Sequence, residues 1–229
     1  MSDLPLIVFD VNETLLDLET LNPIFERIFN DKFAMRLWFS NLILYSEALT
    51  LARSYVPFTD IGEAVLKMLA KTRSIEITSA NEKELREGFS TMSPYPEVPG
   101  ALQKLRSAGF RLFTLTNNVL QVQRRQLEEG RIGQYFERLF SVDQVRQHKP
   151  APETYAHVER ELGVPPSRLF MIACHTWDTL GAVGAGWGAA LIKRPGNDVL
   201  EVGPQPNIVG SDLSAVSDWI IAKYSRGGA

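Results

Sequence analysis

Short, largely apolar runs alternate along most of the chain with stretches in which apolar residues recur at helical spacing. The first run, residues 6–9, is apolar at every position and ends at Asp10, a pattern typical of a strand buried on both faces. Comparable runs predict strands at 110–116, 139–141, 169–173 and 189–192. Helical spacing predicts helices around residues 102–109, 122–128, 153–162, 178–185 and 213–220. Strands that alternate with helices predict a doubly wound α/β fold, in which helices cover both faces of a parallel sheet.

The segment from residue 16 to residue 95 follows a different pattern, with helix signals and no convincing strand. Asn22-Pro23 predicts a helix start, because proline is favoured at the first helical position. From 35 to 54 the apolar residues are dense and helix-spaced, and Ser79 with Glu82 has the spacing of a capping box. The expected organisation is a helical cap inserted into an α/β core, with the cap at 16–95 and the core at 1–15 and 96–229.

Composition narrows the class of protein further. The chain has 229 residues, 45% of them hydrophobic and 22% charged, and a net charge of −3, so no broad basic surface for nucleic acid or an anionic membrane is expected. The single cysteine, Cys174, excludes an intrachain disulfide and fits a reducing compartment. Residues 1–5 contain no basic stretch, so a signal peptide is not expected. We expect a soluble cytoplasmic protein; the sequence leaves its quaternary state open, including a homodimer.

Polar residues follow four of the predicted strands. In open parallel sheets, ligands bind beyond the carboxyl ends of the strands, so these residues are expected at one cleft. Taken singly, each is an ordinary turn, cap or surface residue. Together they suit nucleophilic chemistry, since a carboxylate can attack carbon or phosphorus and form an enzyme ester, and a nearby lysine keeps it ionised. The residues are Asp10; Thr116, Asn117 and Asn118; Lys149; and His175 with Asp178.

These residues fall in four segments that resemble the motifs of the haloacid dehalogenase superfamily. Residues 9–15 resemble motif I, whose aspartate is the nucleophile, and Thr116-Asn117 resembles motif II. Lys149-Pro150 is similar to motif III, and residues 175–182 are similar to motif IV. Order and spacing match over essentially the whole chain, and the helical insertion lies where that superfamily has its cap. The segments at 141–155 and 177–182 are most similar to the type II 2-haloacid dehalogenase branch.

The resemblance implies a mechanism and a set of site residues. Asp10 would attack a carbon of a small 2-substituted carboxylic acid and expel the leaving group, and water activated near Asp178 would then hydrolyse the resulting ester. Thr14 and Thr116 would orient Asp10, while Lys149 would balance its charge. Asn117 would face the leaving group. Tyr155 would support the lysine side of the site. The residues implied in substrate binding are Val11, Asn12, Trp38, Phe39, Tyr45, Thr116, Asn118, Tyr155 and Trp177.

A magnesium-dependent phosphatase is the first alternative, because most of the superfamily has that activity. Those enzymes usually carry a second aspartate two residues after the nucleophile and an acidic metal ligand at the start of motif IV. Here these positions are Asn12 and Cys174. Magnesium prefers hard oxygen ligands. We therefore expect neither a metal nor another cofactor.

The sequence also departs from the dehalogenase pattern. Phe39 stands where the resemblance implies an arginine that assists halide release, and Ala173 and His175 stand where it implies a serine and an asparagine around the water. Another cation would have to assist the halide, and Arg36 and Arg53 lie in the same cap segment. One alternative is a hydrolase that opens the ring of azetidine-2-carboxylate, with His175 donating a proton to the leaving amine. Another is a non-catalytic binding module.

Overall fold

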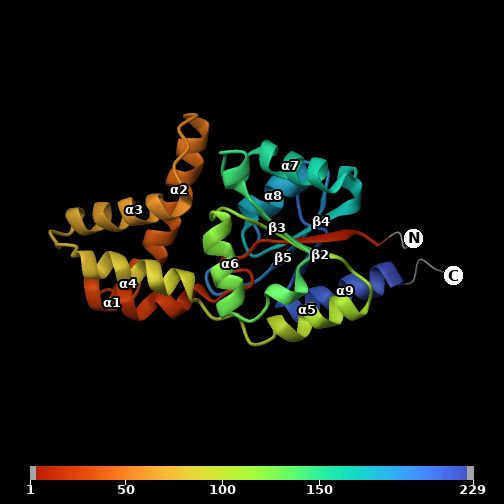
Figure 1. The fold of residues 1–229 in the computed structure, drawn as a ribbon, viewed down its shortest axis with the longest axis horizontal. Helices are drawn as coiled ribbons and strands as arrows, with labels where there is room; N and C mark the ends of the chain where they lie inside the picture. The colour runs from red at the N-terminus through yellow and green to blue at the C-terminus, as the bar shows by residue number, and fades with distance from the viewer. Residues whose placement is uncertain (1–3, 226–229) are drawn as a thin grey trace.

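The computed structural model describes residues 4–225, and residues 1–3 of the N-terminal stretch discussed above lie outside the described part. One six-stranded parallel sheet forms the centre of the larger lobe (Figure 1). Its strand order is β3-β2-β1-β4-β5-β6, so the first strand lies in the middle. The strands are β1 (Leu6–Phe9), β2 (Leu112–Thr116), β3 (Arg138–Ser141), β4 (Leu169–Ala173), β5 (Gly188–Ile192) and β6 (Ile208–Gly210).

Helices cover both faces of this sheet, as the doubly wound prediction requires. Ile7 and Phe9 pack into the cluster that contains apolar residues of α5 (Val98–Ser107) and α9 (Leu213–Ser225). Leu6 and Val8 pack into the opposite cluster, with residues of α7 (Pro152–Leu162) and α8 (Thr176–Gly184). Figure 1 shows these two helix pairs on opposite sides of the sheet. A strand covered on both faces needs apolar residues at every position, which explains the run before Asp10.

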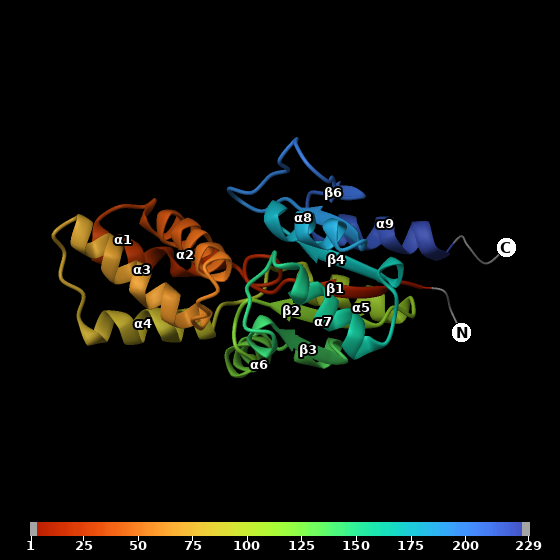
Figure 2. The same cartoon turned by 90° about the horizontal axis from the view of Figure 1, so that it is seen from above.

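The helical segment forms a second lobe beyond the carboxyl ends of the strands (Figures 1 and 2). Its elements are a short 3-10 helix (Leu18–Leu21), α1 (Asn22–Phe29), α2 (Ala34–Leu51), α3 (Phe58–Thr72) and α4 (Ser79–Ser90). The expected capping box is wrong by one residue at each position. Thr78 is the N-cap, and its backbone N–H donates to the Asn81 side chain while its hydroxyl accepts from the Asn81 N–H. Helix α6 (Leu120–Glu129) completes the core.

The chain crosses between the two lobes twice, and the two crossings are held together. The Tyr95 N–H donates to the Leu15 carbonyl at 3.0 Å, and the Asp17 N–H donates to the Ser93 carbonyl at 2.7 Å. These bonds anchor the loop that follows β1. The predicted boundaries at 15/16 and 95/96 fall in these crossings and stay a prediction. Within residues 4–225, every helix is too short or too polar to cross a membrane.

Candidate active site

The candidate site lies where β1 ends between its two neighbours, β2 and β4. Asp10 follows β1 directly, and its backbone N–H donates to the Ile172 carbonyl of β4 at 3.0 Å. Thr116 ends β2, and His175 follows β4 after Cys174. The central position of β1 therefore brings the ends of β2 and β4 to the two sides of Asp10. This is the edge of the sheet at which the sequence predicts a site.

The Asp10 carboxylate is held on both oxygens. The Thr14 hydroxyl donates to Oδ2 at 2.7 Å, and the Lys149 ammonium donates to Oδ1 at 2.9 Å. Asp10 is only 3% exposed. Burial works to raise the pKa of this carboxyl group, but the positive charges of Lys149 and then His175 outweigh burial and hold the pKa below its usual range. Asp10 is therefore an anion at neutral pH, as a carboxylate nucleophile must be.

Lys149 is fully buried and connects three elements. Its ammonium donates to Asp10, to the Leu115 carbonyl of β2 at 2.8 Å and to Oδ2 of Asp178 at 2.5 Å. Its backbone N–H donates to the side-chain oxygen of Asn117 at 3.0 Å. Burial works to lower the pKa of Lys149, but the two carboxylates raise it, so the lysine stays charged. Asn117 thus holds the loop that carries the lysine, and only its side-chain nitrogen is left to face a leaving group.

Asp178 is held on both oxygens as well. Lys149 binds Oδ2, and the Tyr155 hydroxyl donates to Oδ1 at 2.8 Å. Burial raises the pKa of Asp178, against the lowering effect of Lys149. Tyr155 fits against α8 because residue 181 is glycine: a Cβ atom there would lie 2.3 Å from the Tyr155 hydroxyl oxygen. Tyr155 therefore supports the lysine side of the site through Asp178.

His175 lies on the other side of Asp10 and has a partner that sequence reasoning missed. Its Nε2 lies 2.9 Å from Oε2 of Glu13, and its Nδ1 lies 3.4 Å from Oδ2 of Asp10. Glu13 is buried and adopts a left-handed backbone conformation with φ 63°. Its other carboxylate oxygen accepts from the guanidinium of Arg36 on α2. The only sequence signal for Glu13 was its place three residues after Asp10.

Two aromatic rings enclose the His175 imidazole. The Trp177 ring stacks on it with centroids 4.9 Å apart, and the Phe39 ring lies 5.7 Å away. Burial works to lower the pKa of His175, but Cys174, Asp10 and Glu13 raise it well above its usual value. Phe39 thus brings no charge to the site, whereas the imidazole next to it carries one.

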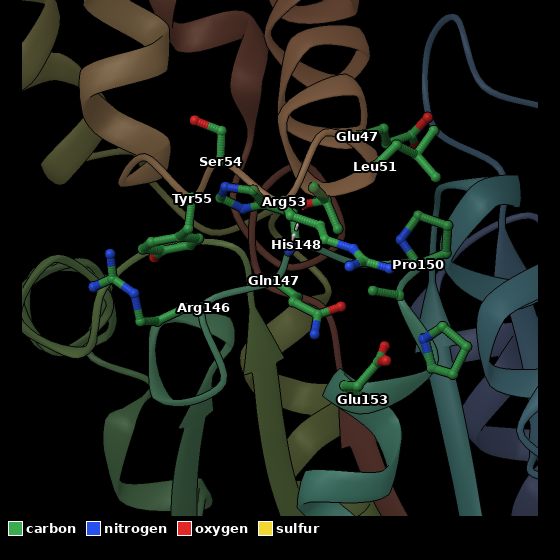
Figure 3. A pocket seen from close by; sticks show the side chains of 13 residues that line it. Glu47, Leu51, Arg53, Ser54, Tyr55, Arg146, Gln147, His148, Pro150 and Glu153 are labelled. Atoms are coloured by element: carbon green, nitrogen blue, oxygen red, sulfur yellow. Dashed lines mark hydrogen bonds between the residues drawn. The ribbon is translucent and has the colours of Figure 1, made fainter.

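Neither cap arginine takes the place of the arginine missing at position 39. Arg36 binds Glu13 and donates to the Pro195 carbonyl at 2.8 Å. Arg53 lines a cleft between the end of α2 and the loop before α7, opposite Glu153 (Figure 3). Arg36 therefore acts on the site through Glu13, and Arg53 belongs to a separate cleft between the two lobes.

Several residues expected to bind substrate have other contacts. Trp38 is buried inside the cap, where its indole N–H donates to the Gly62 carbonyl at 2.8 Å and its ring packs against Phe25. Tyr45 lies on α2 and is 38% exposed. Trp38 is therefore a packing residue of the cap and Tyr45 is partly exposed, and the expected part of both in substrate binding stays a prediction.

Asn12 and Asn118 form a buried amide cluster together with Gln126 of α6. Both Asn118 and Gln126 donate to the Asn12 side-chain oxygen, at 3.3 Å and 3.0 Å. Gln126 also donates to the Phe89 carbonyl of α4 at 2.8 Å. Thr116 does not orient Asp10 through a described bond; its hydroxyl accepts from the Asn118 N–H at 3.2 Å. Val11 is buried beside Asp10 in the same loop. These residues support the loops of the site.

One group of side chains in the described residues has donor atoms close enough for a metal ion. Ligand atoms of Asp10, Cys174 and His175 all lie within 4.8 Å of one another. A thiol and an imidazole are poor ligands for magnesium, which prefers oxygen. Both oxygens of Asp10 are also engaged by Thr14 and Lys149. The donor set does not fit the magnesium site of a phosphatase.

Known proteins resemble this chain in sequence and in fold. Residues 4–186 match the family model of haloacid dehalogenase-like hydrolases. The chain is 25% identical to (S)-2-haloacid dehalogenase H-109 of Pseudomonas putida, and 26% identical to haloacetate dehalogenase H-2 of a Moraxella species; each match covers 94% of this chain and 97% of the relative. A crystal structure of an L-2-haloacid dehalogenase superposes with a TM-score of 0.90 and 26% identity, covering 96% of this chain and 99% of that one.

The match extends over the core and the cap together, and it includes all four segments that bring polar residues to Asp10. The protein is an enzyme that belongs to the haloacid dehalogenase-like hydrolases.

Proposed function

We propose that the protein hydrolyses small 2-haloacids through an ester on Asp10. The observation that carries the proposal is the buried, anionic Asp10, held by Thr14 and Lys149 at the carboxyl edge of the sheet. Relatives that match nearly the whole chain are 2-haloacid dehalogenases. The ring-opening alternative has no support among them. A binding module is a poor explanation, because an ionised carboxylate with a buried lysine is expensive to retain without a chemical use.

In the first step, one Asp10 oxygen attacks C2 of the substrate and halide leaves. Thr14 and Lys149 fix the carboxylate, so the attack needs little reorganisation. Asp178 and Tyr155 in turn hold Lys149 in place. Because Asp10 is almost inaccessible, the cap has to open for substrate and close again, which excludes bulk water from the reacting groups.

In the second step, water attacks the carbonyl carbon of the Asp10 ester and releases the 2-hydroxy acid. Neither step needs a metal, because the leaving group carries no phosphate charge and Lys149 already keeps the nucleophile ionised. The purified protein should therefore release halide from chloro- and bromoacetate or 2-chloropropionate equally well with excess chelator and with added magnesium. Loss of turnover with chelator that magnesium restores, or hydrolysis of a phosphate ester in preference to every haloacid, would contradict the proposal.

Tyr155→Phe is expected to weaken both stability and activity moderately. The variant removes a hydroxyl that donates to a buried carboxylate, so the free energy of unfolding should fall by about 1.5–3 kcal/mol. Lys149 loses part of its support, and turnover should fall about tenfold. Urea unfolding and initial rates of halide release measure the two effects. Tyr135→Phe is the matched control, because Tyr135 is partly buried and packs in the hydrophobic cluster on the other face of the sheet. An equal loss in both variants would contradict the role given to Tyr155.

A further inference from the structure

We propose that Glu13 and His175 act as a dyad that activates the water for hydrolysis of the Asp10 ester, with Arg36 holding Glu13 in position. This inference rests on the proposed function and assigns its second step. His175 would contact the reacting water and is a catalytic residue in that step. Glu13 and Arg36 act through His175 and are positioning residues.

One ring nitrogen of His175 faces the carboxyl group that forms the ester. His175 Nδ1 is buried and has no hydrogen-bond partner among the described residues, and it lies 3.4 Å from Oδ2 of Asp10. A water at hydrogen-bond distance from Nδ1, about 2.8 Å, would lie against the Asp10 carboxyl group. In contrast, both oxygens of Asp178 are already bound, by Lys149 and Tyr155. Once the ester has formed and Nδ1 has lost its proton, the nitrogen available as a base beside the ester is therefore on His175.

Glu13 and two aromatic rings hold the imidazole in place. Glu13 accepts from Nε2 of His175, which orients the ring so that Nδ1 faces Asp10. This is the arrangement in which a carboxylate fixes the tautomer of a histidine base and stabilises its protonated form. Phe39 and Trp177 enclose the ring from α2 and α8, so few other orientations are open to it.

The backbone of Glu13 adopts an unfavourable conformation. A non-glycine residue at φ 63° is held in a sparsely populated conformation, and a buried carboxylate adds a desolvation penalty. Strained, buried, charged residues of this kind concentrate at functional sites. Arg36 offsets the charge from the cap, so the dyad is complete only when α2 lies against the core. Cap closure would then complete the machinery for the second step.

The charges around His175 explain when it becomes a base. The groups that face it are Asp10 and Glu13 from the loop after β1 and Cys174, which directly follows β4. Lys149 and Arg36 lie one contact further away. While Asp10 is an anion, it favours the imidazolium form. Ester formation removes that negative charge, so the pKa of His175 falls and its Nδ1 proton can leave for solvent with the halide.

Over the full cycle, each bond that forms replaces one that breaks, and each proton has a donor and an acceptor. Asp10 forms a C–O bond to C2 while the C–halogen bond breaks, and halide and one proton are released. Water then adds to the Asp10 carbonyl carbon and gives a proton to Nδ1. The tetrahedral adduct collapses, and the departing alkoxide takes that proton from Nδ1 as the 2-hydroxy acid leaves. The proton remaining on the Asp10 carboxyl group moves to Nδ1, which restores the starting anion and imidazolium.

The test separates ester formation from ester hydrolysis in single-turnover reactions with bromoacetate. Halide release reports the first step, and the mass of the Asp10 peptide reports the ester. His175→Gln should release one halide for each site and then stall, with ester hydrolysis slowed at least about a hundredfold. Added imidazole should restore part of the lost hydrolysis in His175→Ala, a rescue that a merely structural role would not produce.

Glu13→Gln tests the positioning role. It keeps His175, so this test does not depend on whether the histidine variants fold. Ester hydrolysis in the wild type should rise with pH through the ionisation of His175. Without the Glu13 charge the imidazolium is less stable, so the midpoint should move to lower pH while the limiting rate falls about tenfold. Glu19→Gln is the matched control, because Glu19 also pairs with Arg36, at 3.6 Å, but is exposed. Its profile should match the wild type.

Two outcomes would overturn the inference in different ways. If the wild type forms an ester and His175→Gln hydrolyses it at the wild-type rate, while Asp178→Asn stalls, the base is Asp178 and the dyad is wrong although the proposed function stands. If the wild type releases no halide from any 2-haloacid and forms no Asp10 ester, the proposed function fails and the dyad fails with it.

Discussion

Replacement of Asp10 by Asn or Ala should reduce halide release by at least about ten-thousandfold, because neither side chain offers an anionic nucleophile. The loss should appear in ester formation itself, so no ester-modified peptide should accumulate in either variant. Initial rates with chloro- and bromoacetate measure the first effect, and the mass of the peptide that contains residue 10 measures the second. Asp218→Asn is the control, since Asp218 is an exposed carboxylate paired with Lys104.

The same reaction in heavy-oxygen water separates attack by Asp10 from direct attack by water. In a single turnover the label should enter the Asp10 carboxylate, and the first product molecule should carry an unlabelled oxygen from the enzyme. Label in that first product, with none in Asp10, would mean that water attacks the substrate directly. Asp10 would then be a base or an electrostatic group, and the ester mechanism would be wrong.

The parallel sheet could be predicted from the sequence because its central strands are buried on both faces. Such strands are apolar at every position, and the run at 6–9 has no other simple explanation. β6 was missed because a three-residue strand at the edge of the sheet carries too few positions to show a pattern. The capping box at α4 was displaced by one residue because Thr78 and Ser79 are both good N-cap residues.

The edge of the sheet at which the candidate residues meet could also be predicted, since parallel strands bring the residues after them to one edge. The contacts within it could not. Whether Asn117 faces a substrate or a backbone N–H depends on the path of the Lys149 loop, which no local pattern determines. Glu13 was missed because its importance comes from a left-handed backbone and from His175, 162 residues away in the chain. Long-range pairs of this kind leave no periodic signal.

Lys149→Met should abolish most of the activity and make the remaining activity depend on pH in a new way. Methionine has a similar length but no charge, so Asp10 and Asp178 would remain buried without the cation between them. Their pKa values should rise, because burial then acts with less opposition. At neutral pH part of Asp10 would be protonated and unable to attack. Halide release should fall at least about a thousandfold, and the remainder should increase as the pH rises.

The stability contributed by Asp10 should depend on pH with opposite signs in the two proteins. In the wild type the pKa of Asp10 is below its unfolded value, so its contribution is present above about pH 4 and is lost as the pH falls through the lowered pKa. The raised pKa of Asp178 acts in the opposite direction in the wild type already. In Lys149→Met both carboxyl groups have raised pKa values, so the folded protein gains stability as the pH falls and they bind protons. Breaking a buried pair costs about 3–5 kcal/mol. Urea unfolding should therefore show a loss of that size at pH 8 and a clearly smaller loss at pH 5.

Lys193→Met is the control, because it removes an exposed lysine paired with Asp198 and should change the free energy of unfolding little at either pH. A loss in Lys149→Met that is equal at both pH values would mean that the lysine contributes packing rather than charge, and Asp10 would have to be kept ionised by His175 alone.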